Sequence, residues 1–125
     1  MQLRDKIVLE KIISEIDVAD ELIGDDSLTV FLDDEKLKRA ISMTIINIGE
    51  LIKTITDELR QEHPEVPWKA AAGMRDIAAH RYQTLRMEDV YNTATADLPY
   101  LKEQLQKILG TDSVGDPDIE ENDYA

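Results

Sequence analysis

Apolar residues recur every three to five positions along most of the chain, which is the spacing that places them on one face of an α-helix. The first such run stops before Gly24, a residue type that commonly follows the last turn of a helix. Its predicted core positions are Leu3, Ile7, Ile12, Ile16, Ala19 and Ile23. Residues 27–32, which come next, predict a short turn or a single piece of helix.

A second long helix is predicted from Asp33, Asp34 and Glu35 to about residue 60, because acidic residues favour a helix N-terminus. Its main apolar line consists of Leu37, Ile41, Thr44, Ile48, Leu51, Ile55 and Leu59. Three further apolar residues lie off this line: Ile45, Ile46 and Ile52. Either both faces are buried within one domain, or the second face packs against another copy of the chain.

Residues 63–68 break the helical pattern with two prolines. We expect His63 to help end the preceding helix and Trp68 to anchor in the core. Pro67 suits the first position of the next helix, where a missing N–H costs little. That helix is predicted over residues 68–80, and small residues at 70–73 would let another helix or a ligand approach its backbone.

Residues 84–89 are predicted to connect to a last helix, which Pro99 kinks or restarts and Gly110 ends. Its predicted core face is Val90, Ala94, Leu98, Leu101, Leu105 and Ile108. The fold class is therefore all-α, an antiparallel bundle of four main helices in one domain over residues 1–110. Residues 111–125, rich in acids, Gly and Pro, are predicted to be a disordered acidic tail.

The net charge of −13 argues against broad, non-specific binding of nucleic acid, and we expect no DNA partner. Six of the acids lie in the tail, but the rest of the chain is acidic too. The absence of cysteine excludes disulfides and thiolate metal sites. Glu10 and Lys11 interrupt the N-terminal apolar run, and no apolar stretch is long enough to span a bilayer. We therefore expect a cytoplasmic protein without a membrane contact.

One segment reverses the sign of the charge. Between residues 66 and 87 the chain carries four basic residues, Lys69, Arg75, Arg81 and Arg86, against the single acid Asp76. The same segment contains His80, one of two histidines. A basic segment with a titratable imidazole in an acidic protein predicts a site that handles phosphate groups. Lys69, Arg81 and Arg86 are its candidate RNA or phosphate contacts.

The chemistry available there is acid–base catalysis beside a fixed cation. A neutral imidazole accepts a proton from a ribose 2′-hydroxyl, and an imidazolium donates one to a leaving oxygen. Arg75 would hold the phosphate, and Asp76 would orient His80. On a continuous helix Arg75 and His80 lie about 140° apart. Their convergence therefore requires a loosened helix or two chains with complementary halves. His80 lacks a complete set of metal ligands, so we expect cleavage of RNA without a metal or cofactor.

The residue blocks 63–68 (His-Pro-Glu-Val-Pro-Trp), 73–76 and 80–82, with 48–50 and 97–99, resemble the HEPN superfamily. More narrowly they are similar to HepT-type toxins, which pair with MntA-type minimal nucleotidyltransferase antitoxins. The resemblance implies an all-helical homodimer whose two Arg-x4-His motifs line a shared cleft. It implies that Arg75 and His80 are ribonuclease residues, that Asp76 fills the polar position after the arginine, and that Tyr82 receives AMP from the partner.

Two other functions remain open at this point. The chain could be a non-catalytic helical interaction module that regulates a nucleotidyltransferase, in which case Tyr82 would matter more than His80. It could also be a nucleotide-binding bundle, which predicts affinity for ATP or AMP by the chain alone, although the sequence contains no phosphate-binding loop.

Overall fold

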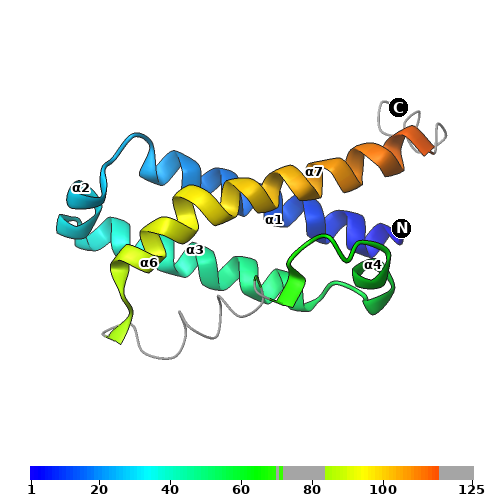
Figure 1. Cartoon of the computed structure of the whole chain (residues 1–125), viewed down its shortest axis with the longest axis horizontal. Coiled ribbons are helices and arrows are strands. Elements are labelled where there is room, and N and C mark those ends of the chain that lie inside the picture. Colours follow the sequence, from blue (N-terminus) through cyan, green and yellow to red (C-terminus); the bar gives the residue numbers. More distant parts are fainter. Residues whose placement is uncertain (70, 72–83, 116–125) are drawn as a thin grey trace.

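The computed structural model describes residues 1–69, 71 and 84–115, with side chains as far as residue 110, and that part of the chain forms helices without a strand. The elements are α1 (Leu3–Ile23), α2 (Leu28–Asp33), α3 (Glu35–Lys53), α4 (Asp57–Glu62), α6 (Met87–Asn92), the π-helix η2 (Thr93–Asp97) and α7 (Leu98–Gly115). Helix α1 runs antiparallel to α3 and α7, and α2 and α4 lie at opposite ends (Figure 1). The predicted all-α bundle is confirmed.

Helix α1 ends where the sequence predicts. Gly24 has a positive φ of 52°, and its N–H donates to the carbonyl of Asp20 at 2.8 Å. The predicted core register near its start is wrong, because the side chains of Leu3 and Ile7 are 71% and 43% exposed. The buried positions are instead Asp5, Leu9, Ile12, Ile16, Ala19 and Ile23. The spacing of these buried positions alternates between four and three residues, as on one face of a helix. That face therefore includes the carboxylate of Asp5.

Helix α3 begins as predicted, with Asp34 accepting from the backbone N–H of Leu37 at 3.0 Å. It ends at Lys53, however, and not near residue 60. The chain bends through residues 54–56, where Thr56 is extended and its hydroxyl accepts from the N–H of Leu59 at the start of α4. Threonine hydroxyls compete with helical hydrogen bonds in this way. The predicted long helix is therefore two helices.

The surplus apolar face of α3 is largely accounted for within one copy of the chain. Ile45 and Ile52 are buried in its own core, and Ile46 is partly buried against that core. The first of the two alternatives, a helix buried on two sides within its domain, is therefore confirmed for these positions.

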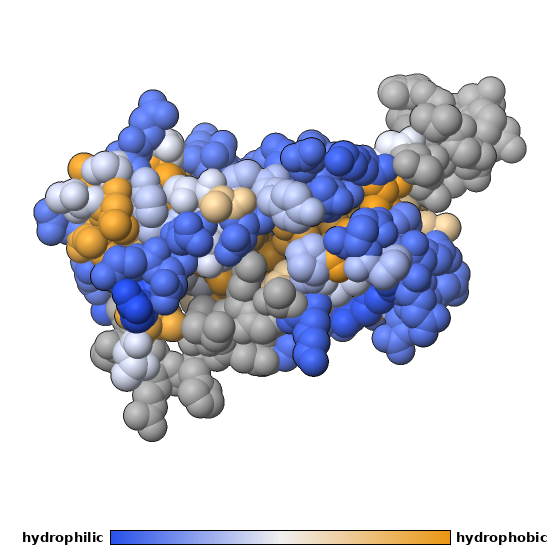
Figure 2. Space-filling view, in the orientation of Figure 1, coloured by the Kyte–Doolittle hydropathy of each residue, from blue (hydrophilic) through white to orange (hydrophobic). Residues whose placement is uncertain are grey.

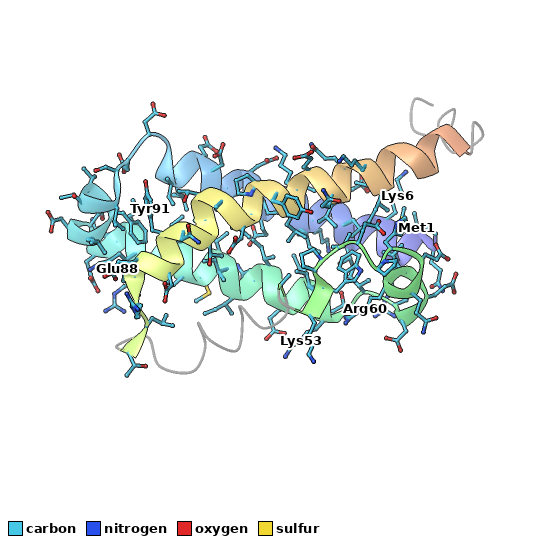
Figure 3. The ribbon with its side chains drawn as sticks, in the orientation of Figure 1. Met1, Lys6, Lys53, Arg60, Glu88 and Tyr91 are labelled. Carbon is cyan, nitrogen blue, oxygen red and sulfur yellow. The ribbon has the colours of Figure 1, made fainter. Side chains whose placement is uncertain are left out.

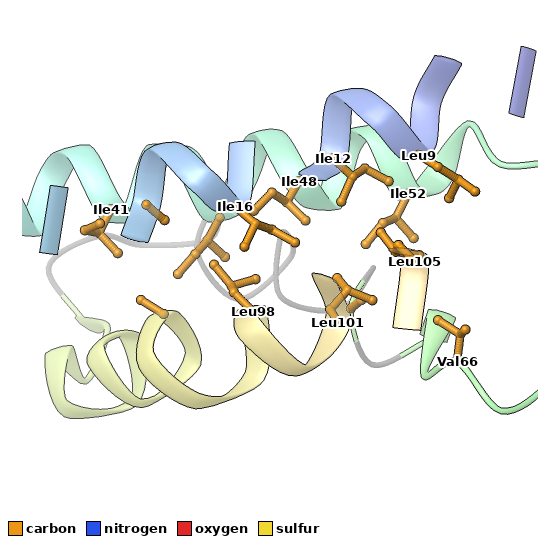
Figure 4. Close-up of a cluster of buried hydrophobic side chains, with 14 of the residues drawn as sticks. Leu9, Ile12, Ile16, Ile41, Ile48, Ile52, Val66, Leu98, Leu101 and Leu105 are labelled. Carbon is orange, nitrogen blue, oxygen red and sulfur yellow. The ribbon is translucent and has the colours of Figure 1, made fainter. Parts of the chain in front are cut away.

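The core lies between α1, α3 and the last helix (Figure 4). All six positions predicted for the last helix are buried: Val90, Ala94, Leu98, Leu101, Leu105 and Ile108. The expected disturbance at Pro99 takes the form of the π-helix η2 directly before it, where the N–H of Leu98 donates to the carbonyl of Thr93. A hydrogen bond between residues five positions apart, in place of the four of an α-helix, marks a widened helical turn.

The predicted end of the last helix at Gly110 is wrong, because α7 continues to Gly115. A glycine inside a helix costs only about 1 kcal/mol relative to alanine, so it weakens a helix without having to end it. The first five residues of the predicted tail are thus helical, and residues 116–125 lie outside the described part. Of the helix predicted over 68–80, only residues 68, 69 and 71 are described, and they are helical.

Candidate functional site

The candidate site falls mainly on residues that the structure does not describe. Arg75, Asp76, His80, Arg81 and Tyr82 all lie outside the described residues. The convergence of Arg75 with His80, and the roles assigned to these side chains, therefore stay predictions. What the structure describes is the chain on either side, and two of the candidate phosphate contacts.

The two described phosphate contacts are both solvent-exposed. Lys69 is exposed in the first turn of helix after Pro67. Arg86 precedes α6, its side chain is 73% exposed, and its Nε lies 4.0 Å from a carboxylate oxygen of Asp89. A solvated ion pair of this kind contributes little stability. Both cations are thus accessible to a phosphate without breaking a strong contact.

The chain that enters the site is fixed by His63 and Trp68. His63 ends α4, with its N–H donating to the carbonyl of Leu59, as predicted. Trp68 is buried, and its Nε1 donates to the carbonyl of His63 at 2.9 Å, so it is the predicted anchor. Pro67 was predicted as the first residue of the next helix, but the helix begins at Trp68 and Pro67 directly precedes it. The carbonyl of Pro67 accepts the first helical hydrogen bond, from the N–H of Ala71 at 3.0 Å. The following segment therefore starts from a rigid point.

The ring of His63 contacts an acid of the same turn. Its Nδ1 lies 3.1 Å from a carboxylate oxygen of Glu65. A hydrogen bond from its own backbone N–H, and then the His63 ring, lower the pKa of the Glu65 carboxyl below its ordinary value. His63 is therefore part of the turn that ends α4, in agreement with its predicted structural role.

The chain that leaves the site is fixed by Tyr91, a residue that the sequence did not single out. Its hydroxyl donates to the carbonyl of Asp26 at 2.7 Å. Its ring packs against buried Phe31 of α2, with 5.4 Å between the ring centroids. Figure 3 shows Tyr91 at the α2 end of the bundle and Lys53 toward the α4 end. Both flanks of the candidate site are thus anchored in the core.

Acidic residues are concentrated between the middle of α1 and the end of α2, whereas the first turns of α3 carry Lys36, Lys38 and Arg39. Residues 12–34 contain eight acidic residues and no basic one. Asp17 is paired with Lys102 of α7 at 2.6 Å, whereas Asp20, Glu21 and Asp25 are exposed. Hydrophilic groups cover most of the face in Figure 2, and apolar groups appear at the α2 end, where Leu28 and Val30 are exposed.

Within residues 1–69, 71 and 84–115, no three His, Cys, Asp or Glu side chains are grouped so that they could hold a metal ion. Over the same residues, none of the helices combines the length and apolar character that crossing a membrane requires.

Comparison with known proteins identifies the family. Residues 12–108 match the family model described as "Ribonuclease HepT-like". A "Putative RNase" of Caldanaerobacter subterraneus is 35% identical over 101 residues, which cover 81% of this chain and 90% of the relative. A "Probable ribonuclease HepT" of Thermococcus cleftensis is 32% identical over 108 residues, covering 86% of this chain and 98% of the relative. Comparison with solved structures gives no match. The chain therefore belongs to the HepT-like ribonuclease family, of the HEPN type.

Proposed function

We propose that this chain is the toxin of a toxin–antitoxin pair and an endoribonuclease that cuts RNA without a metal ion. The observation that carries the proposal is the family match over residues 12–108, which includes the Arg75-x4-His80-x-Tyr82 motif within its bounds. The two relatives named above carry the descriptions "Putative RNase" and "Probable ribonuclease HepT", and the match to this chain covers 90% and 98% of their lengths. The proposed place of action is the cytoplasm.

The proposed reaction is a transfer of the phosphorus from one ribose oxygen to another. His80 takes the proton of a 2′-hydroxyl, the new O2′–P bond forms, and the P–O5′ bond breaks. The leaving O5′ receives a proton from an imidazolium, which in a homodimer is the His80 of the second copy. Arg75 stabilises the charge on the non-bridging phosphate oxygens, and Asp76 orients the His80 ring. Lys69, Arg81 and Arg86 hold neighbouring phosphates of the RNA. The products are a 2′,3′-cyclic phosphate and a 5′-hydroxyl.

The purified chain should cut total RNA in the presence of EDTA, because no step of this reaction uses a metal ion. Intact mass must first match the unmodified sequence, so that a modified Tyr82 is not mistaken for an inactive enzyme. The cut ends are then tested for cyclic phosphate. An unmodified chain that leaves every RNA intact, or one that EDTA inactivates, contradicts the proposal.

The partner in this proposal is an MntA-type nucleotidyltransferase that transfers AMP to Tyr82. An AMP group there would add bulk and negative charge next to Arg75 and His80, where RNA must bind. Incubation with ATP and such an enzyme should therefore abolish RNA cleavage by the wild type and leave Tyr82→Phe active. Tyr100→Phe, which alters an exposed tyrosine on α7, is the matched control and should be inactivated like the wild type. The proposal is wrong about Tyr82 if Tyr82→Phe is inactivated equally.

The acidic stretch over residues 12–34 favours a second candidate, a non-catalytic helical module that binds or regulates a nucleotidyltransferase. An acidic surface attracts basic protein partners and repels RNA. In that case the chain binds the enzyme and accepts AMP on Tyr82, but the unmodified protein cuts no RNA at any concentration tested.

A further inference from the structure

Asp5 is a carboxylate buried near the start of α1, with only 1% of its surface exposed. Its two oxygens accept from a single residue 51 positions later: Oδ1 from the backbone N–H of Thr56 at 3.1 Å, and Oδ2 from the Thr56 hydroxyl. A buried charge is costly unless hydrogen bonds satisfy it, so a carboxylate at this position calls for an explanation. Asp5 also lies before residue 12, outside the range that matches the family model.

The contact fixes the junction between α3 and α4. Thr56 is the residue on which α4 begins, since its hydroxyl accepts from the N–H of Leu59 at 3.3 Å. Two guanidinium groups cover the C-terminal end of α3 at the same junction: Arg4 donates to the carbonyl of Thr54 at 3.0 Å, and Arg60 to that of Ile52 at 2.8 Å. Cations at this end are favoured by the helix dipole. Arg60 and Lys53 are seen at this end in Figure 3.

From this junction, hydrogen bonds lead to the chain that enters the candidate site. The carbonyl of Leu59, in α4, accepts from the N–H of His63 at 3.1 Å. The carbonyl of His63 accepts from Nε1 of Trp68 at 2.9 Å, and buried Ala71 follows in the same helix. Leu59 and His63 each make two of these hydrogen bonds, one toward Thr56 and one toward Trp68, so a shift at Thr56 is passed on to Trp68.

We propose that Asp5 is a positioning residue for the candidate site, because through Thr56, α4 and His63 it sets the position of Trp68, from which the chain continues to Arg75 and His80. The inference rests on the proposed ribonuclease function. Asp5 touches no substrate and acts only through these contacts. Small displacements of catalytic groups lower the rate strongly even when the source of the displacement is remote.

Trp68 provides a readout that does not depend on activity, because it is the only tryptophan of the chain and gives one indole N–H signal in an NMR spectrum. In Asp5→Asn and Thr56→Val this signal should shift and exchange faster with solvent. Thr56→Ser keeps the hydroxyl and should restore the wild-type signal. Ser27→Ala is the matched control: it removes the hydroxyl that caps α2, another six-residue helix, but lies off the path and should leave the signal unchanged.

The kinetic arm separates positioning from stability. At a temperature where circular dichroism shows every variant fully folded, kcat for RNA should fall about tenfold in Asp5→Asn and Thr56→Val. KM should stay within about threefold, since the phosphate-binding cations are unchanged. Thr56→Ser and Ser27→Ala should keep the wild-type kcat.

The outcomes are distinct. An unchanged indole signal in folded Asp5→Asn, or a changed signal with full kcat, overturns the positioning role while the ribonuclease proposal stands. A fall in kcat in Ser27→Ala equal to that in Thr56→Val also overturns it, because the effect would then be general destabilisation. A wild-type chain that cuts no RNA refutes the ribonuclease function itself.

Discussion

Replacing His80 with alanine should lower the rate of RNA cleavage by at least about a hundredfold. A positioned acid–base group contributes on the order of 10²–10⁴ to the rate of a proton transfer, and no nearby group in the sequence replaces the imidazole. His80 is the only histidine in the basic segment, and in a homodimer the substitution removes both copies from the proposed cleft. RNA binding should change little, because the arginines and Lys69 remain.

The measurement is single-turnover cleavage of a defined RNA in EDTA, with RNA binding measured separately. His63→Ala is the control, since it removes the other imidazole, whose contact is with Glu65, and keeps the backbone N–H and carbonyl of residue 63 that lead to Trp68. It should keep more than half of the activity. Arg75→Ala should be as inactive as His80→Ala, because the charge on the phosphate is then left without its cation. Equal activity in the wild type and His80→Ala would point to a contaminating nuclease and would remove the basis for the proposed mechanism.

Leu98→Ala should lower the free energy of unfolding by about 2–5 kcal/mol. Leu98 is 0% exposed, and its side chain points from the last helix toward α1 and α3 in the middle of the core (Figure 4). Removal of its side chain leaves a cavity that the surrounding helices cannot fill, because both ends of the last helix are held by further buried residues, Val90 and Ile108.

Urea unfolding followed by circular dichroism measures this change. Tyr100→Ala is the matched control on the same helix: its side chain is 53% exposed, and the substitution should alter the stability by less than about 0.5 kcal/mol. A loss below 1 kcal/mol in Leu98→Ala would mean that the last helix is not packed as described.

The sequence predicts the helices well where apolar spacing is regular and local. The last helix is the clearest case, since all its predicted core positions are buried and Pro99 marks the altered turn. The start of α1 is predicted wrongly, because apolar character favoured Leu3 and Ile7 over Asp5. The burial of Asp5 depends on Thr56, which no local pattern connects with it. The alternation of four- and three-residue steps was a signal that could have found it.

The break between α3 and α4 also had a local signal. Thr56 is followed by Asp57 and Glu58, and a threonine before two acids is typical of a helix start. The continuous apolar line through Ile55 and Leu59 outweighed it. For the site, the motif and the resemblance indicated the family, which the comparisons confirm. The geometry of Arg75 with His80 depends on how the helix and a second copy are arranged, which residue spacing alone does not determine.

The π turn over Thr93–Asp97 has a consequence for how the length of this protein can vary during evolution. A widened turn holds one residue more than an α-helical turn, so a deletion there would return it to ordinary α-helix. The buried residues before and after would remain on one face. Elsewhere in the last helix, the loss of one residue rotates everything beyond it by about 100° and exposes half of the core face. Single-residue deletions among relatives should therefore concentrate in this turn.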